Sequence, residues 1–502
     1  MVIGGEVTVI NGGRGVKRLE AGDFIGLFET SDWIVNNRTR QIGDWTLVAE
    51  NDVEILFFPK KALAGSTKTA ESFRSYLSSL ARADRVPKTV SPLPLLDWVA
   101  SHTTDKRLSD CAIIAHTHIF PTSVALFRHL AHLVRVGNIF LLDKPYSSVR
   151  ESLNELVKSG VEVIPMAVEK GAPYEFSLKK GVDLLWQRVI EAQKKKRFKK
   201  ILIIDDGGDI LLSIPWRQLQ GARIAGVEQT QRGINRIQDS NIQLPSIVSV
   251  ASSGVKKIIE ADFIGKSVVD KLQSLQILDS VSCVGILGVG SIGKAIKDSL
   301  NKLDKESISY DVSTHKNRTS SSTERNSVDT LIQECDLVIG ATGEDSLRGI
   351  VLDRVKGKKI LASASSSNIE FRSILQLTAF SEQPFSTVRV PIHTDLTLEI
   401  LNGGFPVNFD REKEWEPADD IVLTRCLLYI GIMQVARMLI DENISKGIYA
   451  LDYISQEKML LHWLEDKKIN KKEIRSEYTD VKRIIETNFL QSAKTMPTVW
   501  IK

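Results

Sequence analysis

Three acidic residues lie close together in the stretch ILIIDDGGD, where their spacing could support proton transfer. Asp205 and Asp206 follow the apolar run Ile201–Ile204, and Asp209 follows a Gly-Gly turn. A carboxylate at the end of a buried strand can act as a general acid or base when its surroundings adjust its pKa. Neighbouring residues at a strand end point to opposite sides, so Asp205 points away from Asp206 and we expect Asp205 to be structural.

A glycine-rich motif predicts a dinucleotide site further along the chain. In SCVGILGVGSIGKAIKDSL, the sequence GVGSIG stands between an apolar strand and a helical pattern. The first glycine makes a tight turn, the second admits the pyrophosphate, and the third lets strand and helix pack closely. The helix N-terminus then faces the phosphates. A Rossmann-like fold with an empty site is the alternative.

The residues that follow this motif favour NAD over NADP. The strand SISYD ends in Asp311, which is placed to accept from a ribose 2′-hydroxyl and would repel a 2′-phosphate. The strand in CDLVIGATGED leads into a second loop suited to lie along the cofactor. The predicted cofactor-binding residues of this region are Gly288, Gly290, Ser291, Ile292, Gly293, Asp311, Ala341, Thr342 and Gly343.

The elements that must position these residues alternate between strand and helix. Strands CAIIAH, NIFLLD and VEVIPM are separated by the helical patterns SVALFRHLAHL and SVRESLNELVKSG, and a second such series covers 281–409. Alternation of this kind predicts mostly parallel sheets. We expect an α/β fold, in which a Rossmann-type NAD-binding domain and an α/β substrate-type domain follow a small all-β roll. The predicted boundaries are 1–85 for the roll, 86–265 for the substrate-type domain, 266–409 for the NAD-binding domain and 410–502 for a helical segment.

Composition and charge indicate a soluble protein of several domains. The 502 residues are 42% hydrophobic and 25% charged, with a net charge of +4, which predicts no nucleic-acid partner. Four scattered cysteines fit reduced thiols in the cytoplasm. His116 and His118 form a His-x-His pair without further ligands, so we expect no metal site. No signal peptide or apolar run of about 20 residues is recognised, so no membrane association is expected.

The N-terminal segment resembles the cyclic-nucleotide-binding domain of the catabolite-activator type. Its Gly22–Gly26 turn, GDFIG, matches the turn before that family's phosphate-binding cassette. Leu27 stands where the family has a ribose-binding Glu, and Gln41–Asp44 stands where it has an Arg, with Arg38 and Arg40 out of register. A cyclic phosphate would lack its charged partner. We therefore expect a structural or oligomerisation role, with ligand sensing as the alternative.

The order of DDGGD, Glu-x-Thr-x-x-Gly and GxGxxG resembles S-adenosylhomocysteine hydrolase over roughly 111–408. That family uses bound NAD to oxidise a ribose 3′-hydroxyl, and the resemblance implies a hinged two-domain homo-oligomer. It also implies roles for particular residues. The catalytic candidates are His118, Asp206, Lys256 and Glu260, and further cofactor contacts fall on Thr230 and Asn408. Lys257 is the alternative to its neighbour Lys256.

Several positions depart from that family's pattern. Gln229 replaces a Glu and cannot accept a proton. Thr122 replaces the acid that reads the adenine amino group, and Ser366 replaces a loop histidine. The Gly-His-Pro gate and the C-terminal Lys and Tyr are absent. We expect the remaining residues to support alcohol oxidation but not efficient hydrolysis of adenosylhomocysteine.

Two functions therefore stand open. The first is an NAD-dependent enzyme that oxidises a secondary alcohol of a sugar- or nucleoside-like small molecule. The second is a non-catalytic NAD-binding protein with a regulatory or assembly role. Arg232 and Arg236 lie near the expected cleft and could serve an anionic substrate.

Overall fold

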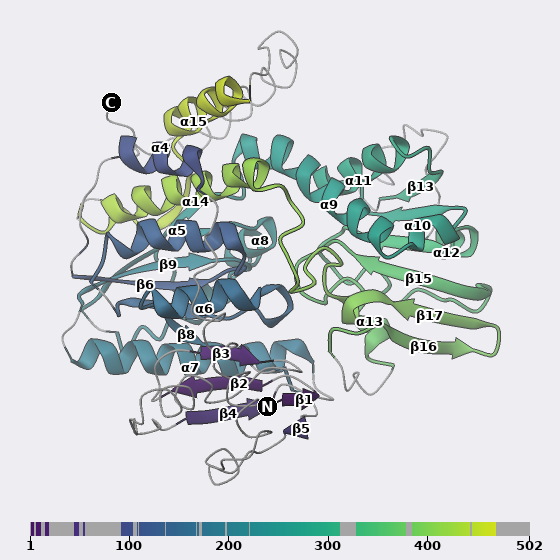
Figure 1. Ribbon diagram of the computed structural model, residues 1–502, viewed down its shortest axis with the longest axis horizontal. Helices are drawn as coiled ribbons and strands as arrows, with labels where there is room; N and C mark the ends of the chain where they lie inside the picture. The colour runs from purple at the N-terminus through teal and green to yellow at the C-terminus, as the bar shows by residue number, and fades with distance from the viewer. Residues whose placement is uncertain are drawn as a thin grey trace, which may run out of the picture.

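A computed structural model describes residues 92–467 and the backbone of five short strands before residue 56. The gaps within 92–467 are 104–107, 109, 136, 167, 170–172, 196–197, 220, 312–327, 378–383 and 442–443. Two sheets with helices on their faces lie side by side (Figure 1). The predicted α/β fold class is confirmed.

The first sheet has seven strands in the order β18-β11-β10-β9-β6-β7-β8, and every pairing in it is parallel. Its central strands are apolar runs without alternation because both of their faces are buried under helices. The strands are β6 (Cys111–His116), β7 (Ile139–Leu142), β8 (Glu162–Ile164), β9 (Lys200–Asp205), β10 (Arg223–Glu228), β11 (Ser246–Ser249) and β18 (Gly447–Ala450). The helices that connect the first six are α5 (Pro121–Ala131), α6 (Arg150–Lys158), α7 (Tyr174–Lys194) and α8 (Gln231–Gln238).

The order of these strands reverses between β6 and β9. From β6 the chain continues outward through β7 and β8, then returns to β9 on the other side and continues to β10 and β11. Ligands of open parallel sheets bind in the crevice at the carboxyl ends of the strands beside such a reversal. His116 ends β6 and Asp205 ends β9, so the predicted acidic stretch lies at this crevice.

The second sheet contains the dinucleotide motif. Its order is β13-β12-β14-β15-β17-β16, with only the β16 edge strand antiparallel. The strands are β12 (Val284–Leu287), β13 (Ser307–Tyr310), β14 (Leu337–Gly340), β15 (Gly357–Ser363), β16 (Val388–His393) and β17 (Leu396–Ile400). The helices are α9 (Ala261–Ser274), α10 (Ile277–Ser280), α11 (Ser291–Asn301), α12 (Val328–Glu334) and α13 (Arg372–Leu375). This sheet is the Rossmann-type domain.

The chain returns to the first sheet after the second is complete. Helix α14 (Ala418–Met438) packs on β10 and β11 and against α4 (Pro94–His102), and β18 then adds the edge strand before α15 (Tyr453–Asp466) (Figure 1). By length and composition α14 could span a membrane, with a mean hydropathy of 1.5, but 94% of that window is buried inside the protein. Its apolar surface is explained by packing, as in the core helix of a soluble protein.

The described N-terminal strands are antiparallel. β2 (Val7–Asn11) pairs with β3 (Val16–Leu19) and β4 (Trp45–Ala49), and β1 (Val2–Gly4) pairs with β5 (Glu54–Ile55). β-structure is thus present where the sequence predicts it. The positions on which the cyclic-nucleotide resemblance depends, 22–27 and 38–44, lie outside the described residues.

Candidate functional site

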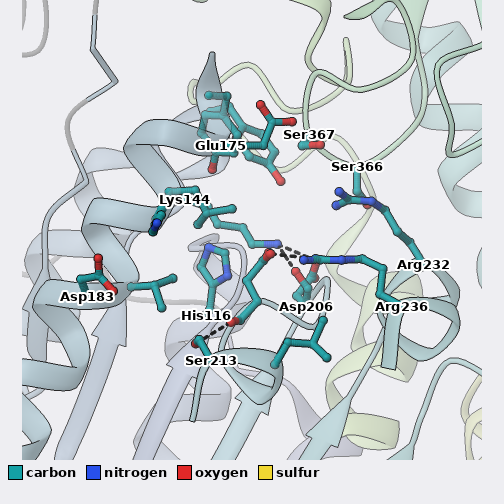
Figure 2. Close-up of a pocket in the computed structure, with 17 residues that line it drawn as sticks. His116, Lys144, Glu175, Asp183, Asp206, Ser213, Arg232, Arg236, Ser366 and Ser367 are labelled. Atoms are coloured by element: carbon teal, nitrogen blue, oxygen red, sulfur yellow. Dashed lines mark hydrogen bonds and ion pairs between the residues drawn. The ribbon is translucent and has the colours of Figure 1, made fainter. Parts of the chain in front are cut away.

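A cavity of about 350 Å³ lies at the carboxyl ends of the first sheet. Its walls come from the ends of β6 and β9 and the starts of α7 and α8, while Ser366 and Ser367 reach it from the Rossmann-type domain (Figure 2). The two domains are bridged here by an ion pair between Glu175 and Arg372. A ligand in the cavity would therefore contact both domains.

Asp206 lies on the cavity wall and is paired with a lysine. The Lys144 ammonium donates to Asp206 Oδ1 over 2.6 Å and to the Asp206 carbonyl oxygen over 2.8 Å (Figure 2). Both side chains are almost fully buried. Burial alone would raise the pKa of Asp206, but Lys144 outweighs it and holds that pKa below its usual range. The carboxylate is therefore ionised at neutral pH.

The second oxygen of Asp206 faces His118 and Gln229. Gln229 Nε2 donates to Asp206 Oδ2 and, over 3.0 Å, to Thr117 Oγ1. His118 Nε2 lies 3.4 Å from the same Oδ2, and His118 Nδ1 lies 2.7 Å from Ser147 Oγ. A carboxylate attracts an N–H and repels a lone pair, so we assign the proton of His118 to Nε2.

The surroundings of His118 keep its ring uncharged. Burial lowers its pKa to about 3, despite the opposing charge of Asp206. The ring packs against Phe409 in a tilted arrangement, with centroids 4.4 Å apart. At neutral pH His118 is thus an uncharged ring whose Nε2 faces Asp206, and it is a poor proton acceptor.

Asp205 has the structural role that the sequence predicts. Its Oδ2 accepts from the backbone N–H groups of Ile210 and Leu211, both over 2.8 Å, and its Oδ1 accepts from that of Asp206. These bonds fix the turn that carries Asp206. Burial, followed by the charge of Asp209, raises the pKa of Asp205 to about 7.

Lys256 and Glu260 form a pair of their own. Lys256 Nζ lies 2.6 Å from Glu260 Oε1 across one turn of a π-helical segment, and the lysine charge reaches His118. Neither side chain is among the residues that line the cavity. Of the four predicted catalytic residues, Asp206 and His118 lie together, Lys256 and Glu260 lie together, and only Asp206 lines the cavity.

Two further predicted positions are occupied by protein contacts. Thr230 caps α8, since its hydroxyl accepts from Gly233 N over 3.0 Å and donates to Glu228. Asn408 Nδ2 donates to Ser267 Oγ and to Glu416 Oε1, both over 3.0 Å, in a buried cluster. Their amide and hydroxyl protons are therefore used within the protein, and any cofactor contact falls to other atoms.

Thr122 is hydrogen-bonded to both members of a buried ion pair, Glu414 and Arg425. Its backbone N–H and its hydroxyl both donate to Glu414, and the hydroxyl also accepts from Arg425 Nε over 2.8 Å. Arg425 and Glu414 are 3.1 Å apart, with side chains only 6% and 7% exposed. Thr122 therefore bonds to other residues of the protein and is not exposed to read the adenine of a ligand.

The glycine motif has the geometry of a dinucleotide loop. A Cβ on Gly293 would lie 1.9 Å from the Gly288 carbonyl oxygen, so the third glycine is required for packing. Gly288 has a φ of +92°, which makes the turn. A Cβ on Gly290 would meet nothing within 4 Å, so this glycine leaves space where the loop faces outward. These features fit the approach of a pyrophosphate.

The two neighbouring loops complete this site. Asp311 follows β13 and accepts from Val289 N over 2.6 Å, which places its carboxylate against the glycine loop. The Ala341–Gly343 loop is held by Glu370, which accepts from Thr342 Oγ1 over 2.7 Å, from the Gly343 N–H and from Ser365. Ser291, Ile292 and Gly293 form the first turn of α11. The nine predicted residues of this region thus lie on three adjacent loops and the first turn of the helix that follows one of them.

Lys144, Tyr146 and Glu370 are site residues that the sequence reasoning missed. Lys144 follows β7 just as Asp206 follows β9, so the end of the strand NIFLLD carried the same signal. Tyr146 bonds to the Ser367 backbone and joins the two domains. Glu370 lies in a loop without a recognisable motif. Among the described residues, no group of three or more His, Cys, Asp or Glu side chains could hold a metal ion.

Residues 267–351 match the family model of the NAD-binding domain of D-isomer specific 2-hydroxyacid dehydrogenases. This match covers the glycine motif and both neighbouring loops. The predicted Rossmann-type domain and the predicted cofactor, NAD, are confirmed. The match supports an NAD-dependent oxidoreductase of the 2-hydroxyacid dehydrogenase type acting on a small molecule.

Similar proteins are also found among curated sequences and solved structures. The uncharacterised protein Rv0104 of Mycobacterium tuberculosis is 27% identical over 373 residues, covering 70% of this chain and 69% of the relative. NAD-dependent formate dehydrogenase from Staphylococcus aureus in complex with NAD is 13% identical, covering 62% of this chain and 95% of that structure at a TM-score of 0.30. NAD-bound 3-phosphoglycerate dehydrogenase of Entamoeba histolytica is 12% identical, covering 66% of this chain and 94% of that structure at a TM-score of 0.29.

Proposed function

We propose that this protein is a cytoplasmic, homo-oligomeric enzyme that uses NAD to oxidise a secondary alcohol of a sugar- or nucleoside-like small molecule. The observation that carries the proposal is the position of the cavity. It lies at the strand-order reversal of one sheet, contains the ionised Asp206, and is lined in part by Ser366 and Ser367 of the NAD-binding domain. A substrate bound there would lie between Asp206 and the cofactor domain.

The cofactor would be held by the glycine loop and its neighbours. Gly288 and Gly290 would admit the pyrophosphate, and Asp311 would take a ribose hydroxyl. Bound NAD supplies the hydride acceptor. Glu370 keeps the Ala341–Gly343 loop in one conformation, so that it can lie along the cofactor.

Oxidation of an alcohol also releases the hydroxyl proton, which the protein must accept. We assign this task to the pair of Lys256 and Glu260, because an ammonium favours the alkoxide and a carboxylate at 2.6 Å can hold the proton. His118 is uncharged and orients Asp206 rather than accepting the proton. Domain closure would have to bring the substrate hydroxyl to Lys256, since that lysine lies outside the cavity wall.

The resemblance to S-adenosylhomocysteine hydrolase depends on the order of motifs, and two contacts favour a different substrate. Gln229 is a donor to Asp206 and so cannot relay a proton. The position expected to read adenine, Thr122, is bonded to Glu414 and Arg425. We therefore expect no efficient turnover of adenosylhomocysteine.

The test is a screen of secondary alcohols with the purified, NAD-saturated protein. Sugars, nucleosides, cyclic polyols and hydroxy acids are added, and reduced nicotinamide is followed by its absorbance. We expect one class to react, and Lys256→Ala to slow that reaction by about 10²- to 10⁴-fold. Lys266→Ala is the matched control, because Lys266 is exposed and pairs only with Asp270 among the described residues.

Two results would contradict parts of the proposal. Bound NAD without reduction by any alcohol would favour the non-catalytic regulatory or assembly role. A loss of activity in Lys257→Ala, with Lys256→Ala fully active, would transfer the proton role to the neighbouring lysine.

A further inference from the structure

The wall of the cavity opposite Lys144 carries an uncompensated positive charge. Arg232, at the start of α8, extends into the cavity toward the loop of Ser366 (Figure 2). It forms no hydrogen bond or ion pair with any residue that the structure describes. Its neighbour Arg236 is different, because it pairs with Asp209 over 2.7 Å and donates to the Gly207 carbonyl.

The other charges around the cavity are balanced. Asp206 is neutralised by Lys144, and Glu175 by Arg372. Lys179 and Asp183 are exposed on one face of α7, one turn apart, and offset each other. The Arg232 guanidinium is therefore the net charge that the described residues present to the interior of the cavity.

Two buried polar side chains that line the same cavity make no side-chain hydrogen bond to any residue that the structure describes, although His116 Nδ1 lies 3.9 Å from Asp205 Oδ1. Both ring nitrogens of His116 and the hydroxyl of Tyr174 have no hydrogen bond, although the residues are only 1% and 3% exposed. Buried polar groups are nearly always hydrogen-bonded, so such groups on a cavity wall point to a ligand. Arg232 and these two groups occupy different elements and converge on one space.

The hydrogen-bonding capacity of His116 and Tyr174 restricts the class of ligand that the cavity can bind. Burial lowers the pKa of His116 well below its usual value, so its ring is neutral and offers one donor and one acceptor. A tyrosine hydroxyl also donates and accepts. A phosphate or a carboxylate alone would satisfy only donors, whereas hydroxyl groups satisfy both kinds.

We propose that this cavity binds a small polyhydroxy anion, with its phosphate or carboxylate on Arg232 and its hydroxyl groups on His116 and Tyr174. The proposal deepens the proposed function by naming the substrate class, and it rests on that function for the oxidation of one of those hydroxyls. A cavity of about 350 Å³ suits such a compound, because it is near the lower limit of ligand pockets.

The test measures binding rather than turnover. NAD-saturated protein is titrated by calorimetry with D-ribose, D-ribose 5-phosphate, D-gluconate and inorganic phosphate. We expect one of the two sugar-derived anions to bind about 10- to 100-fold more tightly than ribose, since a hydrogen bond to a charged group is strong. The preferred anion distinguishes a phosphate from a carboxylate.

Two substitutions test whether Arg232 and Tyr174 contact the bound anion. Arg232→Gln should reduce the affinity for the anion to that for ribose, whereas Arg217→Gln, an exposed arginine outside the cavity lining, should leave it unchanged. Tyr174→Phe should reduce the affinity for the sugar-derived anion by about tenfold, without reducing the affinity for inorganic phosphate. Because the Tyr174 hydroxyl has no partner in the free protein, this variant should melt at or above the wild-type temperature.

The outcomes separate this proposal from the proposed function. Equal binding of ribose and both anions, binding of neither anion, or unchanged affinity in Arg232→Gln would overturn the anion site. Oxidation of a neutral alcohol at a rate independent of Arg232 would overturn it while leaving the alcohol dehydrogenase function intact. If the anion binds in an Arg232-dependent way but no alcohol reduces NAD, the anion site is supported and the alcohol dehydrogenase function is overturned.

Discussion

Asp205 and Glu228 are two neighbouring buried carboxyl groups, and neither forms an ion pair with a lysine or arginine in the part of the chain that the structure describes. Burial and the charge of Asp205 raise the pKa of Glu228 well above its usual value, and the pKa of Asp205 rises to about 7. Unfolded carboxyls titrate near pH 4. A group whose pKa is higher in the folded state binds protons more tightly there, so stability falls as pH rises above the unfolded value. The free energy of unfolding should therefore decrease between about pH 4 and 7.

Glu228→Gln should remove much of this pH dependence. Glu228 Oε1 accepts from Gly207 N, Thr230 N and the Thr230 hydroxyl, and an amide oxygen can keep all three bonds. The variant should be on the order of 2 kcal/mol more stable than the wild type at pH 8, with little difference at pH 4. Denaturant unfolding at a series of pH values checks this. An exposed Glu191→Gln is the control, and an unchanged pH slope in Glu228→Gln would refute the assignment.

At the scale of residues, local patterns predicted some roles and missed others. Asp206 was recognisable because it follows an apolar run and precedes two glycines. The pairing of Asp206 with Lys144 was not recognisable, because the ion pair forms only when β7 and β9 are aligned on either side of β6. Glu370 was missed for a similar reason, since its acceptor role depends on a loop near residue 342 that lies far away in the sequence.

The glycine loop between β12 and α11 allows a matched pair of substitutions. In Gly293→Ala the new methyl group would lie 1.9 Å from the Gly288 carbonyl, so both stability and NAD binding should be lost. In Gly290→Ala the methyl group meets no protein atom within 4 Å, so the free protein should keep its melting temperature. The same methyl group would obstruct the pyrophosphate, and the NAD affinity should fall at least about tenfold.

Thermal unfolding without cofactor and calorimetric titration with NAD measure the two effects separately. Gly290→Ala must lose affinity without losing stability. Equal NAD affinity in the wild type and Gly290→Ala would mean that the pyrophosphate does not approach this glycine.

At the scale of elements, the alternation of strands and helices predicted both parallel sheets. Periodicity shows where a strand begins and ends, and the glycine motif identified β12 as the first strand of the Rossmann-type domain. Neither periodicity nor the glycine motif could show that β18 joins the first sheet. That pairing depends on the apolar α14 covering β10 and β11, which is a property of the assembled core.

At the scale of the whole molecule, Glu414 and Arg425 fix the returning chain to the first domain. Glu414 precedes α14, Arg425 lies within it, and both bond to Thr122 at the start of α5. Removing one member of a buried ion pair leaves an uncompensated charge and typically costs about 3–5 kcal/mol. Glu414→Gln and Arg425→Met should each be destabilising by about this amount.

The double variant tests whether the two residues act as a pair. Because it leaves no unpaired charge, it should be less destabilising than the sum of the single variants, by about 1–3 kcal/mol. Denaturant unfolding of the four proteins measures this difference. Additive effects would show that the two charges stabilise the protein independently.

The late arrival of β18 has a consequence for how the protein is made. β11 and the strand that covers its edge are separated by the whole Rossmann-type domain, roughly 200 residues, which a ribosome synthesises in about 10–40 s. During that time β11 is an open sheet edge, and the faces later covered by α14 are exposed. The seven-stranded domain thus begins synthesis before the Rossmann-type domain but is completed after it, and we expect the nascent chain to need a chaperone over this interval.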